Sequence, residues 1–101
     1  MYQTKMIDEF EQLQKKQPLA IIDVREEEEY ASGHISEAIS LPLSQIQERV
    51  DLLDKEQAYY VICHSGGRSQ MACEFLAAKG YQVTNILGGM SAWKGELVYG
   101  L

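Results

Sequence analysis

The sequence predicts a single α/β domain with a mainly parallel sheet of about five strands and helices on both faces. Three observations favour this class. Strand-like and helix-like patterns alternate along the chain, without an internal repeat or a linker. The run "LAIIDV" is of the continuous β-branched kind that a parallel strand covered on both faces requires. The length of 101 residues suits one hydrophobic core and is too short for two domains.

The first third of the chain predicts a helix, a strand and a short helical turn. Residues 5–17 have the spacing of an amphipathic helix that ends at Pro18. Its apolar stripe comprises Met6, Ile7, Phe10 and Leu13. The run "LAIIDV" then predicts a buried strand. The four glutamates at 26–29 suit the start of a short helical segment closed by Gly33, where we expect them to be solvated.

The remaining elements follow in the same alternation. "HISEAISLPL" supplies a short strand before Pro42, and "SQIQERVDLL" a helix with Ser44 as its N-cap and Ile46, Val50 and Leu53 inward. "YYVIC" is a second buried strand, followed by a helix from about Ser69 to a C-terminal Gly80. "YQVTNIL" predicts a further strand, Gly88 and Gly89 a tight turn, and "MSAW" a last helical turn.

Composition narrows the function classes. A formal net charge of −6 repels a nucleic-acid backbone, so we expect no nucleic-acid partner. No apolar run approaches a membrane span and the N-terminus turns acidic early, which favours a cytoplasmic protein without a membrane partner. The two cysteines fit no zinc spacing, so we infer no metal and no cofactor. In a reducing compartment both are expected to be free thiols, with Cys73 buried in the core.

The segment "CHSGGRS" carries the chemistry. Cys63 ends a buried strand and a helix begins about six residues later, which places the thiol over that helix's N-terminus. Gly66 and Gly67 are expected to take positive φ values, so that the loop forms a concave nest of inward N–H groups. Such a nest favours a thiolate and lowers the pKa of Cys63. Arg68 suits either contact with an anion or a structural role through backbone carbonyls.

Other polar residues have competing interpretations. Asp23 and Arg25 follow the first buried strand and are expected to form a buried ion pair or hydrogen-bond network rather than to contact substrate. His34 is interpreted as a hydrogen-bonded structural histidine. His64 and Ser65 should point outward toward the pocket mouth. The side chain of Trp93 could belong to the hydrophobic core or to the wall of a binding pocket, and both roles are equally compatible with the sequence.

Three segments in the same order carry a resemblance to a known family. "IIDVREEEEYASGHISEAISLPL", "VICHSGGRSQMACEFL" and "GYQVTNILGGMSAW" together resemble a single-domain rhodanese of the thiosulfate sulfurtransferase family, over nearly the whole chain. The resemblance implies one rhodanese-like domain at residues 1–101. It also implies a persulfide carried on Cys63 and held by the loop amides of residues 64–69, which are His64, Ser65, Gly66, Gly67, Arg68 and Ser69. Asp23, Arg25 and Trp93 would support this site.

The function that this resemblance implies is transfer of a sulfane sulfur from thiosulfate or a persulfide donor to a thiol or cyanide acceptor. A sulfur-relay protein, or a regulatory protein-binding module with little thiosulfate activity, stays open as the alternative. Partners would be small sulfur-containing anions such as thiosulfate, and a thiol acceptor or sulfur-carrier protein. Four residues separate Cys63 from Arg68. The loop of cysteine phosphatases is similar but has five residues between its cysteine and its arginine. The shorter loop of this chain therefore favours a site for one added sulfur atom over a site for a phosphoryl group.

Overall fold

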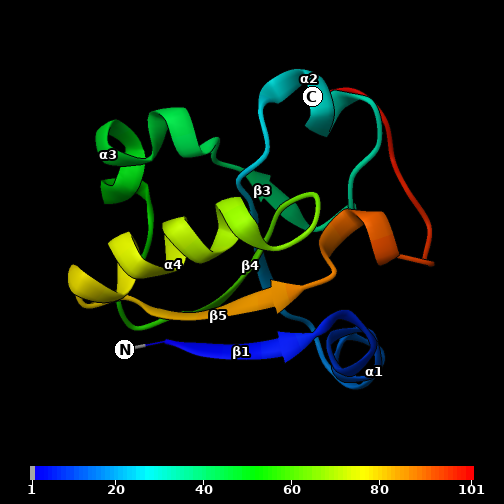
Figure 1. The fold of residues 1–101 in the computed structure, drawn as a ribbon, viewed down its shortest axis with the longest axis horizontal. Helices are drawn as coiled ribbons and strands as arrows, with labels where there is room; N and C mark the ends of the chain where they lie inside the picture. Colours follow the sequence, from blue (N-terminus) through cyan, green and yellow to red (C-terminus); the bar gives the residue numbers. More distant parts are fainter. Residues whose placement is uncertain (1) are drawn as a thin grey trace.

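The computed structural model describes residues 2–101 and contains one five-stranded sheet (Figure 1). Every neighbouring pair of strands is parallel, in the order β1-β5-β4-β2-β3, so the predicted class is confirmed. The strands are β1 (Gln3–Met6), β2 (Ala20–Asp23), β3 (Ala38–Ser40), β4 (Ala58–Ile62) and β5 (Gln82–Leu87). Their carboxyl ends therefore meet at one edge of the sheet.

The helices connect these strands on both faces of the sheet. They are α1 (Ile7–Lys16), α2 (Glu27–Ala31), α3 (Ile46–Arg49) and α4 (Gly67–Ala78). Three short 3₁₀ segments complete the connections: η1 (Leu43–Gln45), η2 (Val50–Leu52) and η3 (Gly89–Ala92). The expected short turn at "MSAW" is thus a 3₁₀ turn that begins at the second glycine of the Gly-Gly pair.

The core has two parts because the central strands are covered on both faces. At the end of β4 and in the residue after it, successive side chains alternate between the two parts: Val61 and Cys63 face the cluster under α3 and α4, whereas Ile62 faces the cluster under α1 and α2. Phe10 of α1 and Leu76 of α4 are both fully buried, one in each cluster. This double coverage explains why the sequences of β2 and β4 are almost entirely apolar.

Two predicted helices differ from the structure. The segment predicted as a helix over 5–17 begins with strand β1, and the helix starts only at Ile7. Met6 therefore lies outside the apolar stripe and is 52% exposed. The segment 44–53 is not one regular helix but a succession of η1, α3 and η2. Ser44 lies inside η1 rather than at an N-cap, and its hydroxyl donates to a carboxylate oxygen of Glu26.

The predicted end of α4 is confirmed. Gly80 follows the helix with a φ of +96°. Its N–H donates to the carbonyl of Ala77, and the N–H of Tyr81 donates to that of Leu76, which is a Schellman arrangement that glycine favours.

Among residues 2–101, no helix is long and apolar enough to cross a membrane. The expected domain of residues 1–101 includes Met1, which lies outside the described residues.

Candidate active site

The site lies where β2 and β4 run side by side. Asp23 at the end of β2 pairs in register with Ile62 at the end of β4. The helices that follow these strands lie on opposite faces, since α2 packs Tyr30 into one core cluster and α4 packs Leu76 into the other. Such a divergence opens a crevice at the carboxyl ends of the strands, where ligands of α/β sheets bind.

The sulfur of Cys63 lies at the N-terminus of α4. It accepts a hydrogen bond from the N–H of Gly66 at 3.0 Å, and it lies 3.3 Å from the hydroxyl oxygen of Ser69. Burial raises the pKa of Cys63, but the Ser69 hydroxyl and the N–H groups of Ser69, Gly66 and Ser65 outweigh burial and lower the pKa below its usual value. The lowered pKa favours the thiolate, which is the nucleophilic form of cysteine.

The two glycines of the loop, Gly66 and Gly67, differ in backbone conformation and in position relative to α4. Gly66 takes a φ of +128°, which an L side chain rarely adopts, and serves as the N-cap of α4. Gly67 lacks a positive φ and is the first residue of the helix, so the prediction for Gly67 is wrong. One left-handed residue is enough because the helix begins two residues earlier than Ser69, and its free N–H groups complete the cradle.

Ser69 and Asn85 form a buried polar pair beneath the loop. The Ser69 hydroxyl lies 2.5 Å from the amide oxygen of Asn85 and 3.1 Å from the carbonyl of Gly66, and both side chains are at most 2% exposed. Because the hydroxyl carries a single proton, it donates to one of its neighbours at a time. Sequence reasoning missed Asn85, although a polar amide flanked by apolar residues toward the end of β5 was a visible signal.

The segment after β5 holds the cysteine loop through its backbone. The N–H of Met90 donates to the carbonyl of Cys63 and the N–H of Ser91 to that of His64, both at 2.8 Å. The N–H of Gly88 donates to the carbonyl of Ser65 at 3.0 Å. These three bonds fix the carbonyls of the loop outward from its centre, which leaves its N–H groups to face the sulfur.

Asp23 and Arg25 form a buried ion pair beside the loop. The guanidinium of Arg25 donates to both carboxylate oxygens of Asp23 at 2.8–3.1 Å and to the carbonyl of Gly33 at 2.8 Å. The side chain of Arg25 is 7% exposed and that of Asp23 is 0% exposed. The pair thereby ties the end of β2 to the turn after α2.

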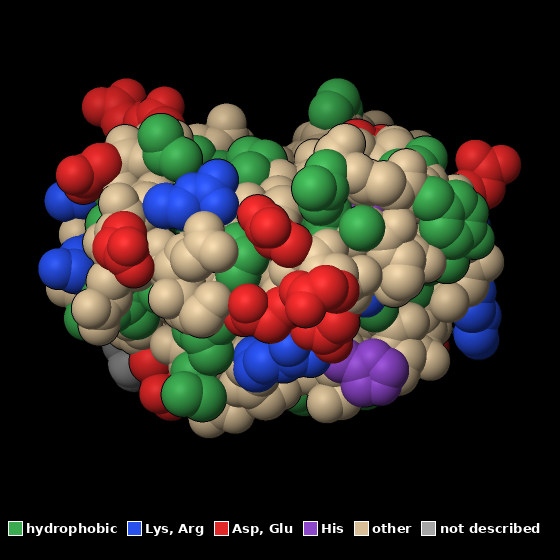
Figure 2. Space-filling view, turned by 90° about the horizontal axis from the view of Figure 1, so that it is seen from above, with side chains coloured by type: hydrophobic (Ala, Val, Ile, Leu, Met, Phe, Trp, Pro, Cys, Tyr) green, Lys and Arg blue, Asp and Glu red, His purple; other side chains and the backbone are tan. Residues whose placement is uncertain are grey.

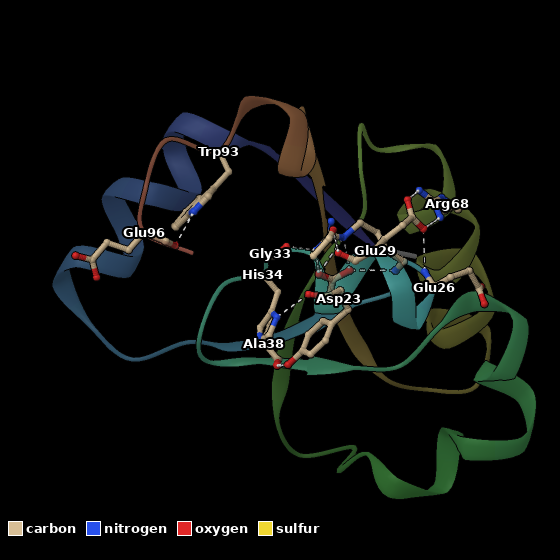
Figure 3. Close-up of polar contacts among 12 residues, drawn as sticks. Asp23, Glu26, Glu29, Gly33, His34, Ala38, Arg68, Trp93 and Glu96 are labelled. Atoms are coloured by element: carbon tan, nitrogen blue, oxygen red, sulfur yellow. Dashed lines mark hydrogen bonds and ion pairs between the residues drawn. The ribbon is translucent and has the colours of Figure 1, made fainter. Parts of the chain in front are cut away.

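Arg68 is paired with Glu29 of α2, a contact that joins two segments 39 residues apart in the sequence (Figure 3). The guanidinium donates to the two carboxylate oxygens at 2.6 and 2.9 Å, and the N–H of Glu26 donates to the same carboxylate. The Arg68 hydrogen bonds, aided by the Glu26 N–H, lower the pKa of Glu29 to about 2. The partner of Arg68 is thus the carboxylate of Glu29, and not the backbone carbonyls that one of the two predicted alternatives named. Glu29 was predicted as part of a solvated helix start, and its side chain is 38% exposed, but its pairing with Arg68 was not predicted.

The two histidines lie in different environments. His34 is buried, its ring stacks on Tyr30 with centroids 3.6 Å apart, and its Nδ1 lies 2.7 Å from the Tyr30 carbonyl. A carbonyl only accepts, so this nitrogen carries the proton. His64 is exposed beside the loop.

A cavity of about 350 Å³ opens next to the cysteine loop. Its lining includes His64, Arg25 and Glu29, with Met90, Trp93 and Leu97 as an apolar wall. Trp93 also packs against Phe10 with ring centroids 6.2 Å apart, so it is both a core aromatic and a pocket wall. A larger cavity on the other side of Trp93, about 520 Å³, is not lined by the cysteine loop.

The second cysteine lies apart from this chemistry. Cys73 is fully buried in the core cluster under α4, and burial together with the neighbouring charge of Cys63 raises its pKa to about 12. Both cysteines are free thiols. Among the described residues, no three histidine, cysteine or acidic side chains are grouped so that they could hold a metal ion.

Fold and site together define a class: a parallel α/β domain whose strand-end cysteine sits in a cradle of backbone N–H groups. The model of the rhodanese-like domain matches residues 6–96, and the chain belongs to this family. It is 42% identical over 86 residues to YtwF, a candidate sulfurtransferase of Bacillus subtilis (strain 168), which covers 85% of this chain and 84% of that protein.

Two further relatives agree with this assignment. Thiosulfate sulfurtransferase GlpE of Coxiella burnetii is 34% identical over 84 residues, covering 82% of this chain and 78% of that protein. The crystal structure of a rhodanese-like domain protein from Staphylococcus aureus superposes with a TM-score of 0.89 at 35% identity, covering 98% of this chain and 99% of that one.

Proposed function

We propose that this protein is a sulfurtransferase that carries a sulfane sulfur as a persulfide on Cys63. The observation that supports this most directly is the position of the Cys63 sulfur, which receives the Gly66 N–H at 3.0 Å and has a lowered pKa. The relatives support the same chemistry, because YtwF and GlpE both bear the name of sulfurtransferases.

In the first half-reaction, the Cys63 thiolate attacks the outer sulfur of a donor such as thiosulfate. A new S–S bond forms to Cys63, the donor's own S–S bond breaks, and its electron pair leaves with sulfite. The negative terminal sulfur of the persulfide then faces the free N–H groups at the start of α4, among them that of Ser69. Fixed dipoles of this kind stabilise developing charge without having to reorganise.

In the second half-reaction, a thiol or cyanide attacks the terminal sulfur and Cys63 leaves as a thiolate. The acceptor departs as a persulfide or as thiocyanate, and no added oxidant or reductant is needed. A thiol acceptor fits as a small molecule or as a cysteine of a sulfur-carrier protein. Because both half-reactions share one covalent intermediate, the proposal requires ping-pong kinetics.

The test is the intact mass of the protein after incubation with thiosulfate and then with cyanide. Wild type should gain about 32 Da, one sulfur atom, and lose it on cyanide addition. Cys63→Ser should show no gain while melting as wild type does. Cys73→Ser is the matched control and should load as wild type does, since that thiol is buried away from the loop. Loading of Cys63→Ser, or no loading of wild type by thiosulfate or any persulfide donor, would overturn the proposal.

A further inference from the structure

The cations near the cysteine loop are already neutralised. Arg25 directs three hydrogen bonds from Nε and Nη2 to Asp23, and Arg68 directs both terminal nitrogens to Glu29. A guanidinium held by a carboxylate in this fork geometry offers little attraction to a second anion. To bind a dianionic donor through Arg68, the protein would first have to break the bond to Glu29.

Beyond these pairs, carboxylates are in excess at this edge. Residues 26–29 are four consecutive glutamates, and only Glu29 pairs with a cation among the described residues. Glu27 and Glu28 are exposed, and Glu26 is half-buried. Figure 2 shows acidic side chains gathered directly beside basic and histidine side chains on this face. The carboxylates of Asp23 and of residues 26–29 thus outnumber the two guanidinium groups of Arg25 and Arg68, which disfavours the approach of an anionic donor.

The apolar part of the cavity suits a carbon-bearing donor. Met90, Trp93 and Leu97 line it, and its volume of about 350 Å³ exceeds what a single small inorganic ion would fill. Such a wall offers buried apolar contact to the carrier of a sulfur atom and nothing to the oxygens of thiosulfate.

From these three features we propose that the preferred sulfur donor is a persulfide on a neutral or positively charged carrier, and that thiosulfate is disfavoured by the pairing of Arg68 with Glu29. This inference rests on the proposed function. The Cys63 thiolate attacks the terminal sulfur of R–S–SH, the S–S bond of the donor breaks, and the carrier leaves as R–S⁻. Cys63 becomes Cys–S–SH, so atoms and charge balance without another reactant.

Two small donors of similar size and opposite charge test the inference. Cysteamine persulfide carries an ammonium group, and mercaptopropionate persulfide carries a carboxylate. Time-resolved intact mass at low salt should show the cationic donor loading Cys63 at least about tenfold faster, the scale of electrostatic steering. The ratio should shrink as salt rises from about 20 mM to about 500 mM, while the thiosulfate rate should increase. Equal rates for the two donors, or faster loading by thiosulfate than by cysteamine persulfide, would refute the inference.

The variant that isolates the ion pair is Glu29→Gln. It releases Arg68, and we expect kcat/KM for thiosulfate to rise about tenfold while cysteamine persulfide still loads. Glu27→Gln is the matched control, because it removes one charge from the same helix without touching Arg68, and it should raise the thiosulfate rate much less. If Glu29→Gln melts and loads cysteamine persulfide as wild type does but gains nothing on thiosulfate, the ion pair does not select the donor.

If Glu29→Gln fails to fold, the double variant Glu27→Gln with Glu28→Gln replaces it, since both side chains are exposed. It should reduce the cysteamine preference severalfold, and an unchanged preference would count against the inference. Persulfides of cysteine peptides, with lysine or glutamate beside the cysteine, then test for a protein donor. A lysine peptide that loads Cys63 faster than cysteamine persulfide does would indicate a protein donor, and a slower one would indicate a small-molecule donor. Loading of Cys63 without charge preference overturns this inference alone, whereas no loading from any donor overturns the proposed function.

Discussion

Gly89 is the residue whose replacement tests most directly how the cysteine loop is held. Its φ is +52°, and a Cβ built there would collide with the carbonyl oxygen of Cys63 and come within 2.7 Å of that of His64. Both obstacles are backbone atoms, so a rotamer change cannot relieve the clash. Gly89→Ala must therefore displace the loop or the segment after β5.

The size of the effect follows from what that displacement breaks. A left-handed alanine costs about 1–2 kcal/mol. The hydrogen bonds from Met90 to Cys63 and from Ser91 to His64 lie at the point of collision, and each contributes about 0.5–1.5 kcal/mol. We expect a loss of about 3 kcal/mol in the free energy of unfolding. At roughly 4–8 °C per kcal/mol for a domain of this size, the melting temperature should fall by more than about 10 °C.

The assay is a thermal melt and a denaturant titration, with persulfide loading of Cys63 measured on the same samples. Gly67→Ala is the matched control, because its built Cβ has no neighbour within 4 Å and its φ is not positive. It should melt at the temperature of wild type or up to several degrees above it, since alanine is a better helix former than glycine by up to about 1 kcal/mol. If Gly89→Ala melts and loads as Gly67→Ala does, the segment after β5 does not hold the loop.

Three further outcomes are expected from the site. Ser69→Ala should slow alkylation of Cys63 at mildly acidic pH by roughly tenfold, the effect of about 1.4 kcal/mol from one hydrogen bond to a charged group, as measured by a pH–rate profile. Because the pKa of Glu29 is lowered from 4.5 to about 2, its ion pair stabilises the fold fully above pH 4.5, and this stabilisation is lost as the pH falls toward 2. The free energies of unfolding of wild type and Glu29→Gln should therefore differ by at most about 1 kcal/mol at neutral pH and become equal as the pH falls through that range. Cys73 should react with a thiol reagent only after denaturant unfolds the domain, as counted by mass, and labelling of two thiols in native protein would contradict its burial.

The sequence predicts the central strands well because the apolar residues that identify each of them are consecutive in the chain. The runs that became β2 and β4 are almost entirely apolar, as strands covered on both faces require, whereas β5 includes the polar residues Gln82, Thr84 and Asn85. Strand β1 was not predicted, because its residues are polar or half-exposed and its last one, Met6, happens to extend the helical spacing of α1. An edge strand buries little, so its sequence carries a weak signal.

At the site, the prediction reached the residues that are consecutive in sequence and missed their partners. Cys63, its loop and the helix after it could be located because strand end, glycine and helix start follow one another directly. The pairing of Arg68 with Glu29 spans 39 residues, and no spacing rule indicates which of four neighbouring glutamates an arginine will choose. Such contacts depend on how the helices are placed over the sheet.

The placement of the loop explains why so short a segment holds a buried thiol with a lowered pKa. Three strands end at the same edge, and each contributes something different: β4 supplies Cys63, β2 leads to the Asp23–Arg25 pair, and β5 leads to the backbone bonds from Met90 and its neighbours. The N–H groups that face the sulfur are thereby fixed before any sulfur arrives, so their dipoles need not reorganise during transfer. The ion pairs Asp23–Arg25 and Glu29–Arg68 lie outside this cradle and neutralise the two guanidinium groups near it. Under the donor preference proposed above, the backbone N–H groups alone attract the sulfur anion, and the surrounding charge selects the carrier that delivers it.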